Sequence, residues 1–200
     1  MNSKKWFTII ELLVWIVVFL LWLLSAYLLI FSSLSASSKS RDEIIVANLA
    51  REKLELLRNI RDTNWIQYLK WNKLDNWWMV WLTLTWWYYR IENNLSDTDP
   101  NKISIYKLSS SFNENDPQWA WPWDNVRLCT DSRWIYTYDC TTNKPSHFYT
   151  FLKVEPLVTE DASWNAIPVD DAYKVNAISV IWNKSKSRYV ISTIITDWKK

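Results

Sequence analysis

A single carboxylate lies inside a long apolar segment near the start of the chain. The segment runs from residue 7 to residue 31, and Glu11 is its only charged side chain. An unpaired carboxylate next to hydrocarbon is costly, so acidic residues in such segments usually meet a partner cation. We therefore interpret Glu11 as a functional group whose chemistry is ion pairing in an apolar environment.

The rest of the chain offers little catalytic chemistry. Its one histidine, His147, lies in the turn-to-strand context Lys144-Pro145-Ser146-His147-Phe148, and nothing around it indicates a nucleophile with its general base. No phosphate-binding loop is present, and a formal net charge of +2 with 22% charged residues gives no nucleic-acid footprint. We expect no enzymatic activity, no cofactor and no nucleic-acid partner.

Two acidic loops contain hard oxygen ligands of the kind that calcium prefers. Asp97 and Asp99 lie in one loop, and Asp170-Asp171 lie in another. The spacing is not that of an EF-hand, and Asp, Asn and Pro are also the residues that turns select. A solvated loop is the favoured interpretation, with Asp97 and Asp99 as weak calcium candidates.

The apolar segment 7–31 is long enough to span a membrane. At ~1.5 Å per residue a helix of this length measures roughly 37 Å, against about 30 Å for the hydrocarbon core of a bilayer. Lys4 and Lys5 precede the segment, so we expect a single span with its N-terminus in the cytoplasm and an extracytoplasmic domain after it. The small-residue stretch 32–38 also fits a signal-peptidase site, which makes a cleaved export signal an alternative.

A second helical pattern follows the apolar segment, and short strands follow that. Apolar residues at 45, 49, 56 and 60 share one helical face, so one helix is expected from about residue 7 to about residue 62. From about residue 78 the pattern becomes β-rich, which predicts an α+β fold with an antiparallel sheet packed on the second half of the helix. The expected strands are 79–85, 88–92, 103–108, 126–129, 135–140, 148–155, 174–182 and 187–196.

Cys129 and Cys140 lie around a predicted hairpin in a compartment that permits oxidation. A disulfide between them would stabilise the fold by about 3 kcal/mol through loop entropy. If the hairpin turns at Ser132-Arg133, Cys129 opposes Tyr136, so a bulge or a longer loop is needed to bring the sulfurs together. The sequence leaves the bonded and the free states open.

The N-terminal stretch KKWFTIIELLVWIVVFLL resembles the signature of type IV pilins and type II secretion pseudopilins. The resemblance implies that a prepilin peptidase cleaves between Trp6 and Phe7 and that Phe7 is then N-methylated. It also implies that Glu11 faces the terminal amine of a neighbouring subunit. Major pseudopilins of that family use a calcium loop.

The resemblance also implies a pilin-like organisation and a set of partners. We expect a leader at 1–6, a transmembrane and filament-core helix at 7–31, its amphipathic continuation at 32–65 and a globular β-rich domain at 66–200. The implied partners are other pilin-like subunits, the prepilin peptidase, an inner-membrane assembly platform and, before assembly, the lipid bilayer. The mature chain would then belong to a filament at the cell surface.

One position departs from the family pattern, because Trp6 stands where the peptidase needs a small residue. The chain has no glycine and 17 tryptophans, whereas average usage gives about 14 glycines in a chain of this length. We therefore hypothesise that most of these tryptophans are glycine in the organism, as happens where UGA is read as glycine. The positions that this hypothesis assigns to glycine are Trp6, Trp15, Trp22, Trp71, Trp77, Trp78, Trp81, Trp86, Trp87, Trp134 and Trp164. Trp65, Trp182 and Trp198 look like true aromatic residues.

The resemblance implies a filament subunit, more specifically a minor pilin or a pseudopilin. The alternative is a single-span, membrane-anchored binding module that never polymerises, in which the tryptophans are genuine. The sequence does not separate a pilus from a secretion filament, or adhesion from motility, DNA uptake or secretion.

Overall fold

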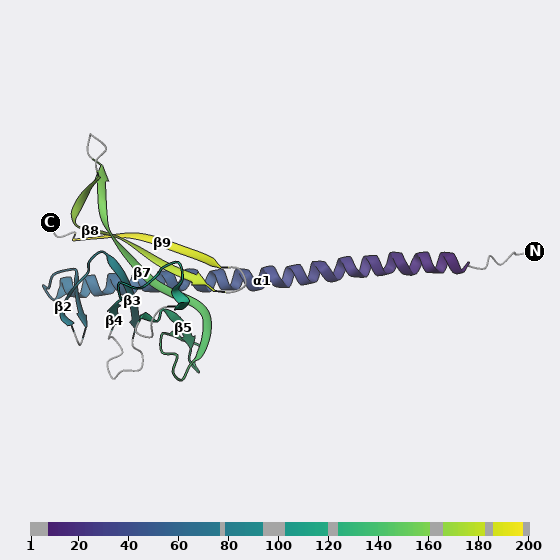
Figure 1. Cartoon of the computed structure of the whole chain (residues 1–200), viewed down its shortest axis with the longest axis horizontal. Helices are drawn as coiled ribbons and strands as arrows, with labels where there is room; N and C mark the ends of the chain where they lie inside the picture. The colour runs from purple at the N-terminus through teal and green to yellow at the C-terminus, as the bar shows by residue number, and fades with distance from the viewer. Residues whose placement is uncertain are drawn as a thin grey trace, which may run out of the picture. The chain divides into compact units, whose positions relative to one another are not determined.

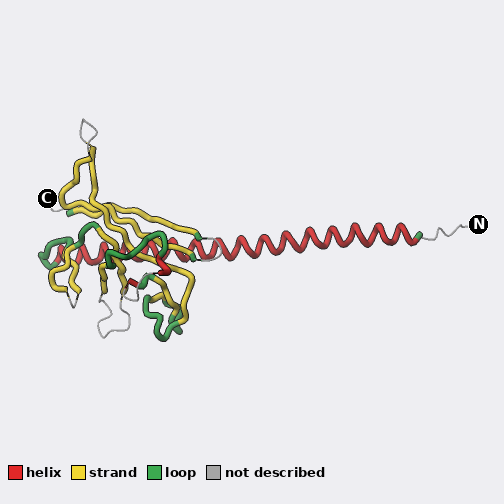
Figure 2. Tube along the Cα trace, in the orientation of Figure 1, coloured by secondary structure: helices red, strands yellow, loops and turns green. Residues whose placement is uncertain are grey.

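The computed structural model confirms the predicted α+β fold, in which one long helix is followed by antiparallel strands (Figures 1 and 2). The chain divides into two compact units, residues 1–44 and residues 45–200, and each is described by itself. The described residues are 8–76, 79–93, 103–119, 124–160, 166–182 and 186–197.

Helix α1 spans Ile9–Ile66, a length of 58 residues, because no proline or glycine interrupts it. At its start the N–H of Leu12 donates to the carbonyl of Thr8. At its end the N–H of Leu69 donates to the carbonyl of Asn64, and the N–H of Tyr68 to that of Trp65. Tyr68 has a φ of 58°, which completes a Schellman-type C-terminus. The helix thus passes the predicted end near residue 62.

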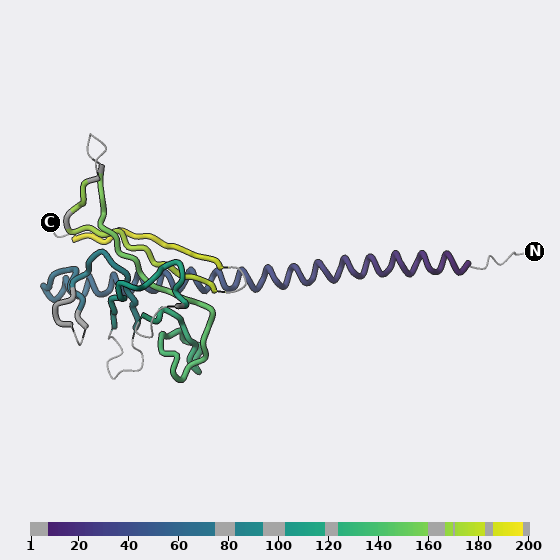
Figure 3. The backbone as a smooth tube through the Cα atoms, in the orientation of Figure 1, coloured from purple at the N-terminus to yellow at the C-terminus, as the bar shows by residue number. Residues whose placement is uncertain are grey.

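The strands form two antiparallel sheets in the described part of the chain. A two-stranded sheet pairs β1 with β2, and a seven-stranded sheet contains the others in the order β4-β3-β7-β5-β6, with β8 between β7 and β9. Figure 3 follows the chain from β7 through β8 into β9, which lie side by side. The bounds are β1 Lys73–Asn76, β2 Met79–Thr83, β3 Trp87–Asn93, β4 Ile103–Lys107, β5 Arg127–Thr130, β6 Tyr136–Thr137, β7 Lys144–Glu160, β8 Ala166–Ile181 and β9 Ser187–Thr196. The 3-10 turn η1 covers Pro117–Trp119.

The predicted strands all occur, with different lengths in several cases. β9 has the predicted bounds, whereas β7 and β8 extend beyond theirs because they pair with each other as far as Glu160 and Ala166. β6 is much shorter than the predicted run 135–140, because the chain leaves the sheet after Thr137. β1 was not predicted, because Lys-Leu-Asp-Asn shows no apolar alternation.

The core of the second unit lies between residues 45–66 of α1 and the seven-stranded sheet. Leu54 and Leu57 belong to a buried cluster with Leu152, and Val46 belongs to a second one with Phe151. The predicted helical face is slightly offset, because Leu49 is buried whereas Ile45, Leu56 and Ile60 are only partly buried. The side chains of α1 that are buried are Val46, Leu49, Ala50, Lys53, Leu54, Leu57 and Asn64.

Candidate functional site

The first unit presents an apolar surface on all sides of its helix. Every large apolar side chain from Ile9 to Leu34 is exposed, from 43% at Leu23 to 80% at Ile9. A helix that is apolar all round needs an apolar environment from outside the chain, because water covers such a surface at a large free-energy cost. The segment is therefore a binding surface for lipid or for other helices.

Length and composition make α1 the one helix in the described part of the chain that is able to cross a membrane. The apolar stretch lies near the N-terminus, and none of it is buried within the chain. Signal sequences have the same properties, so this observation gives a compatible span and does not give its topology.

Glu11 lies in the first turn of α1, and its side chain is exposed. Its backbone N–H donates to Oγ1 of Thr8 over 3.3 Å. The sequence Thr-Ile-Ile-Glu has the spacing of a capping box, in which a hydroxyl residue and an acid three positions later satisfy the free N–H groups of a helix start. A carboxylate at this end also interacts favourably with the helix dipole. Sequence reasoning missed Thr8, although the capping-box spacing was present.

Glu11 therefore has a local role at the helix start through its backbone N–H, and its carboxylate remains available for a second role. No described cation lies within ion-pair distance of it. Its side chain lies on an exposed apolar surface, where a cation from another chain has access to it. Trp6 and Phe7, the expected cleavage residues, lie outside the described residues.

The two acidic loops that contain the calcium candidates are described only in part. Asp97 and Asp99 lie outside the described residues, and the described residues hold no group of three or more His, Cys, Asp or Glu side chains suited to a metal ion. Asp171 has a left-handed φ of 57°, and its carbonyl accepts a hydrogen bond from the N–H of Asp197. Asp171 lies within β8 (Ala166–Ile181), where the pairing with β7 is irregular between Pro156 and Val158, so this geometry is that of a β-bulge.

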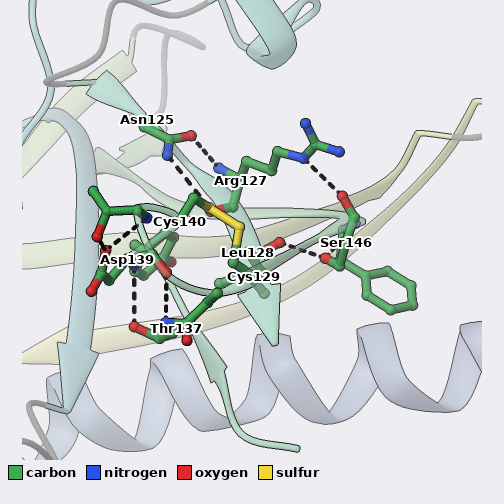
Figure 4. The surroundings of a disulfide bond; sticks show 12 residues. Asn125, Arg127, Leu128, Cys129, Thr137, Asp139, Cys140 and Ser146 are labelled. Atoms are coloured by element: carbon green, nitrogen blue, oxygen red, sulfur yellow. Dashed lines mark hydrogen bonds between the residues drawn. A yellow bond between two sulfur atoms is a disulfide. The ribbon is translucent and has the colours of Figure 1, made fainter. Parts of the chain in front are cut away.

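Cys129 and Cys140 are joined by a disulfide with a Cα–Cα distance of 5.4 Å (Figure 4). The predicted opposition of Cys129 and Tyr136 is wrong by one residue, because Cys129 faces Thr137. The hairpin loop holds one residue more than the predicted turn at Ser132-Arg133. Cys140 reaches Cys129 from the loop that follows β6, as the longer-loop alternative requires.

A cleft of about 620 Å³ lies beside the disulfide-bonded loop, lined in part by Lys53, Glu92 and Trp134. Lys53 is buried, with its Nζ 3.1 Å from Oε1 of Glu52 and 5.3 Å from the ring centre of Tyr138. Glu92 accepts hydrogen bonds from the Thr137 hydroxyl and from the N–H of Tyr138. These two charged groups therefore already make contacts within the fold. Sequence reasoning did not single out Lys53 or Glu92.

The Tyr138 phenol is the most strongly perturbed titratable group near this cleft. Burial raises its pKa well above the ordinary value, and the charge of Arg90 offsets this only in part. Its hydroxyl donates to the carbonyl of Thr150 over 3.0 Å.

His147 lies in β7 with its ring against Phe148 at 4.1 Å between ring centres, and its carbonyl accepts a hydrogen bond from the N–H of Trp182.

The described part of the chain thus contains a folded domain and one surface that requires a partner. That surface is the apolar half of α1. A long apolar N-terminal helix packed on an antiparallel sheet is a pilin-like architecture. No protein-family model, no curated protein and no solved structure matches this chain.

Proposed function

We propose that the chain is a minor pilin or pseudopilin, a structural subunit of a type IV pilus or of a type II secretion-like filament. A prepilin peptidase removes residues 1–6, Phe7 becomes N-methylated, and the N-terminal helices bundle in the filament core. Before assembly the apolar helix lies in the inner membrane with its N-terminus in the cytoplasm, and the domain is extracytoplasmic. Its partners are other pilin-like subunits, the peptidase and the assembly platform.

The observation that carries the proposal is the exposure of the apolar half of α1 together with an exposed acid in its first turn. A plain membrane anchor explains the apolar surface and has no use for Glu11 beyond the helix cap. A helical bundle explains both, because helices cover one another's apolar surfaces and the acid meets a cation of the next subunit.

The assembly step follows from the chemistry of cleavage. Removal of the leader creates a positively charged amine at Phe7, and Glu11 of a neighbouring subunit neutralises that amine where water is excluded. Removing one partner of a buried ion pair leaves an uncompensated charge, which costs about 3–5 kcal/mol. Loss of Glu11 is therefore expected to reduce incorporation into filaments by about two to four orders of magnitude.

Glu11→Gln separates the assembly role from the capping role. Glutamine serves in a capping box as glutamate does, so this change removes the charge and keeps the helix start. Cells that lack their own copy are given the unmodified chain, Glu11→Gln or Thr8→Val, and filaments are sheared off and quantified by immunoblot. We expect Glu11→Gln to be lost from filaments and Thr8→Val to be retained, because the cap is worth only about 1 kcal/mol. Normal incorporation of Glu11→Gln would contradict the proposal.

A second candidate is a single-span, membrane-anchored extracytoplasmic binding module that does not polymerise. Trp6 favours it, because the family peptidase needs a small residue at that position and would leave such a leader in place. Mass spectrometry of the N-terminal peptide from the native cells decides between the two. A methylated Phe7 start supports the filament subunit, and an intact Met1 start supports the anchor.

A further inference from the structure

The turn between β5 and β6 places a tryptophan in left-handed backbone. The N–H of Asp131 donates to the carbonyl of Ile135 over 3.0 Å, which closes the loop, and the N–H of Trp134 donates to the carbonyl of Asp131 over 3.1 Å. Trp134 has a φ of 64°. This is the pattern of a three-residue hairpin loop, in which a turn is followed by a left-handed residue.

The rest of the loop is built to hold this conformation. Oδ1 of Asp131 accepts hydrogen bonds from the N–H of Arg133 over 2.8 Å and from the N–H of Ile135 over 2.9 Å. These bonds favour the charged carboxylate and lower the pKa of Asp131. The left-handed conformation at position 134 is therefore set by the aspartate and by the strand pairing on either side, whichever residue stands at that position.

Tryptophan is poorly suited to this position and contributes little there. A left-handed φ is uncommon for a non-glycine residue and is an outlier for a bulky one, whereas glycine adopts it without a steric penalty. The indole of Trp134 is 85% exposed, and no ring or cation contact with another described residue involves it. Trp182 differs, because its ring lies 6.1 Å from that of Tyr149 and 4.3 Å from Nζ of Lys186.

From this geometry and from a composition with no glycine and 17 tryptophans, we infer that the protein made in the cell carries glycine at position 134 and tryptophan at position 182. The codon at 134 is then one that the organism reads as glycine and the printed sequence writes as tryptophan. Tyr68 is the other bulky residue with a left-handed φ. It remains tyrosine in the cell, because the reassigned codon is one that is written as tryptophan. The inference does not depend on the proposed function.

Two consequences follow for other parts of the molecule. The rim of the cleft beside Lys53 loses the indole of Trp134, which leaves Tyr106 and Tyr136 as its aromatic lining in the cell. If the codon at position 6 is the same as that at position 134, the residue before Phe7 is glycine, which is small enough for the prepilin peptidase. This second consequence alone rests on the proposed function.

The test is tandem mass spectrometry of the protein purified from its own cells, reduced and digested with trypsin. Cleavage after Arg133 makes position 134 the first residue of its peptide, and the peptide 175–184 contains Trp182 as the matched control. We expect glycine at 134 and tryptophan at 182, with a UGA codon at 134 and UGG at 182 in the gene. Tryptophan at 134 would overturn the inference. Glycine at both positions would uphold it at 134 and overturn the assignment of Trp182.

Discussion

Residues 9–34 and residues 45–66 belong to the same helix and differ in what covers them. Large apolar side chains in the first region are all exposed, whereas in the second Val46, Ala50 and Leu57 are buried against strands of the sheet. The first region is apolar on every face, and the second is apolar on one face and charged on the other. A one-sided stripe packs within its own chain, and an all-round apolar surface requires lipid or other helices.

The acids of the two regions differ in the same way. Glu52 and Glu55 lie within 3.1 Å of a cation of their own helix, at Lys53 and Arg58 respectively. Glu11 has its local cap and no described cation within ion-pair distance. The difference separates charges that are paired within the fold from a charge that has no partner cation among the described residues.

Truncating one leucine in each region gives the largest expected contrast in the stability of the domain. Leu57→Ala removes a side chain that is 2% exposed, and it should lower the free energy of unfolding by about 2–5 kcal/mol. Leu20→Ala alters a side chain that is 56% exposed, and it should change that free energy by less than about 0.5 kcal/mol. Thermal unfolding of the full chain in detergent, followed by near-ultraviolet circular dichroism, measures both. Equal effects would mean that the first region also packs inside the chain.

Removing the disulfide tests whether the two regions unfold separately. Cys129→Ala with Cys140→Ala should cost the domain about 3 kcal/mol, because the denatured chain regains loop entropy. In detergent the helical signal of residues 9–34 should persist through this earlier transition. A reductant should lower the midpoint of the unmodified protein and leave that of the double variant unchanged. Simultaneous loss of the helical signal and of the domain would contradict separate unfolding.

Much of the fold was predictable because periodicity reports which elements bury a face. The α+β class, the long helix and the bounds of β9 all follow from apolar spacing. The failures lie where tertiary pairing overrides local pattern. β7 and β8 extend each other beyond their apolar runs, and β1 forms without an apolar pattern because β2 is its partner.

The residues of the candidate site differ in how far the sequence predicted them. Glu11 stands out in the sequence because charge is rare in an apolar run, and its cap by Thr8 was readable from spacing alone. The buried ammonium of Lys53 was not, since no local pattern tells a buried lysine from a solvated one. The register of Cys129 was missed by one residue because the left-handed backbone at Trp134 adds a residue to the loop.

A smaller effect on stability concerns the buried phenol of Tyr138, which lies near Lys53 of the second region of the helix. Burial raises the pKa of Tyr138 above its unfolded value, so the folded protein keeps this proton where the unfolded chain has lost it. The stability from this group is complete below about pH 10 and is lost as the pH rises further, by about 1 kcal/mol between about pH 10 and 11. Unfolding free energies measured across this range should fall less steeply in Tyr138→Phe than in the unmodified protein. Equal slopes would show that the phenol titrates alike in both states.

The smallest expected effect has the opposite sign and concerns backbone conformation. Trp134→Gly relieves a left-handed residue, a strain of about 1–2 kcal/mol, and increases the entropy of the unfolded chain by about 0.5–1 kcal/mol. The net gain in the free energy of unfolding should be about 0.5 kcal/mol, measured by denaturant titration in detergent. Tyr68→Gly, at a φ of 58°, is the matched control and should give a similar gain. Trp71→Gly should be strongly destabilising instead, because that side chain is 7% exposed and packs 5.9 Å from the ring of Tyr173. This packing speaks against the sequence-based hypothesis of glycine at position 71. If Trp134→Gly also destabilised the domain, the indole would be contributing contacts beyond those described, and the conformational argument for glycine at this position would fail.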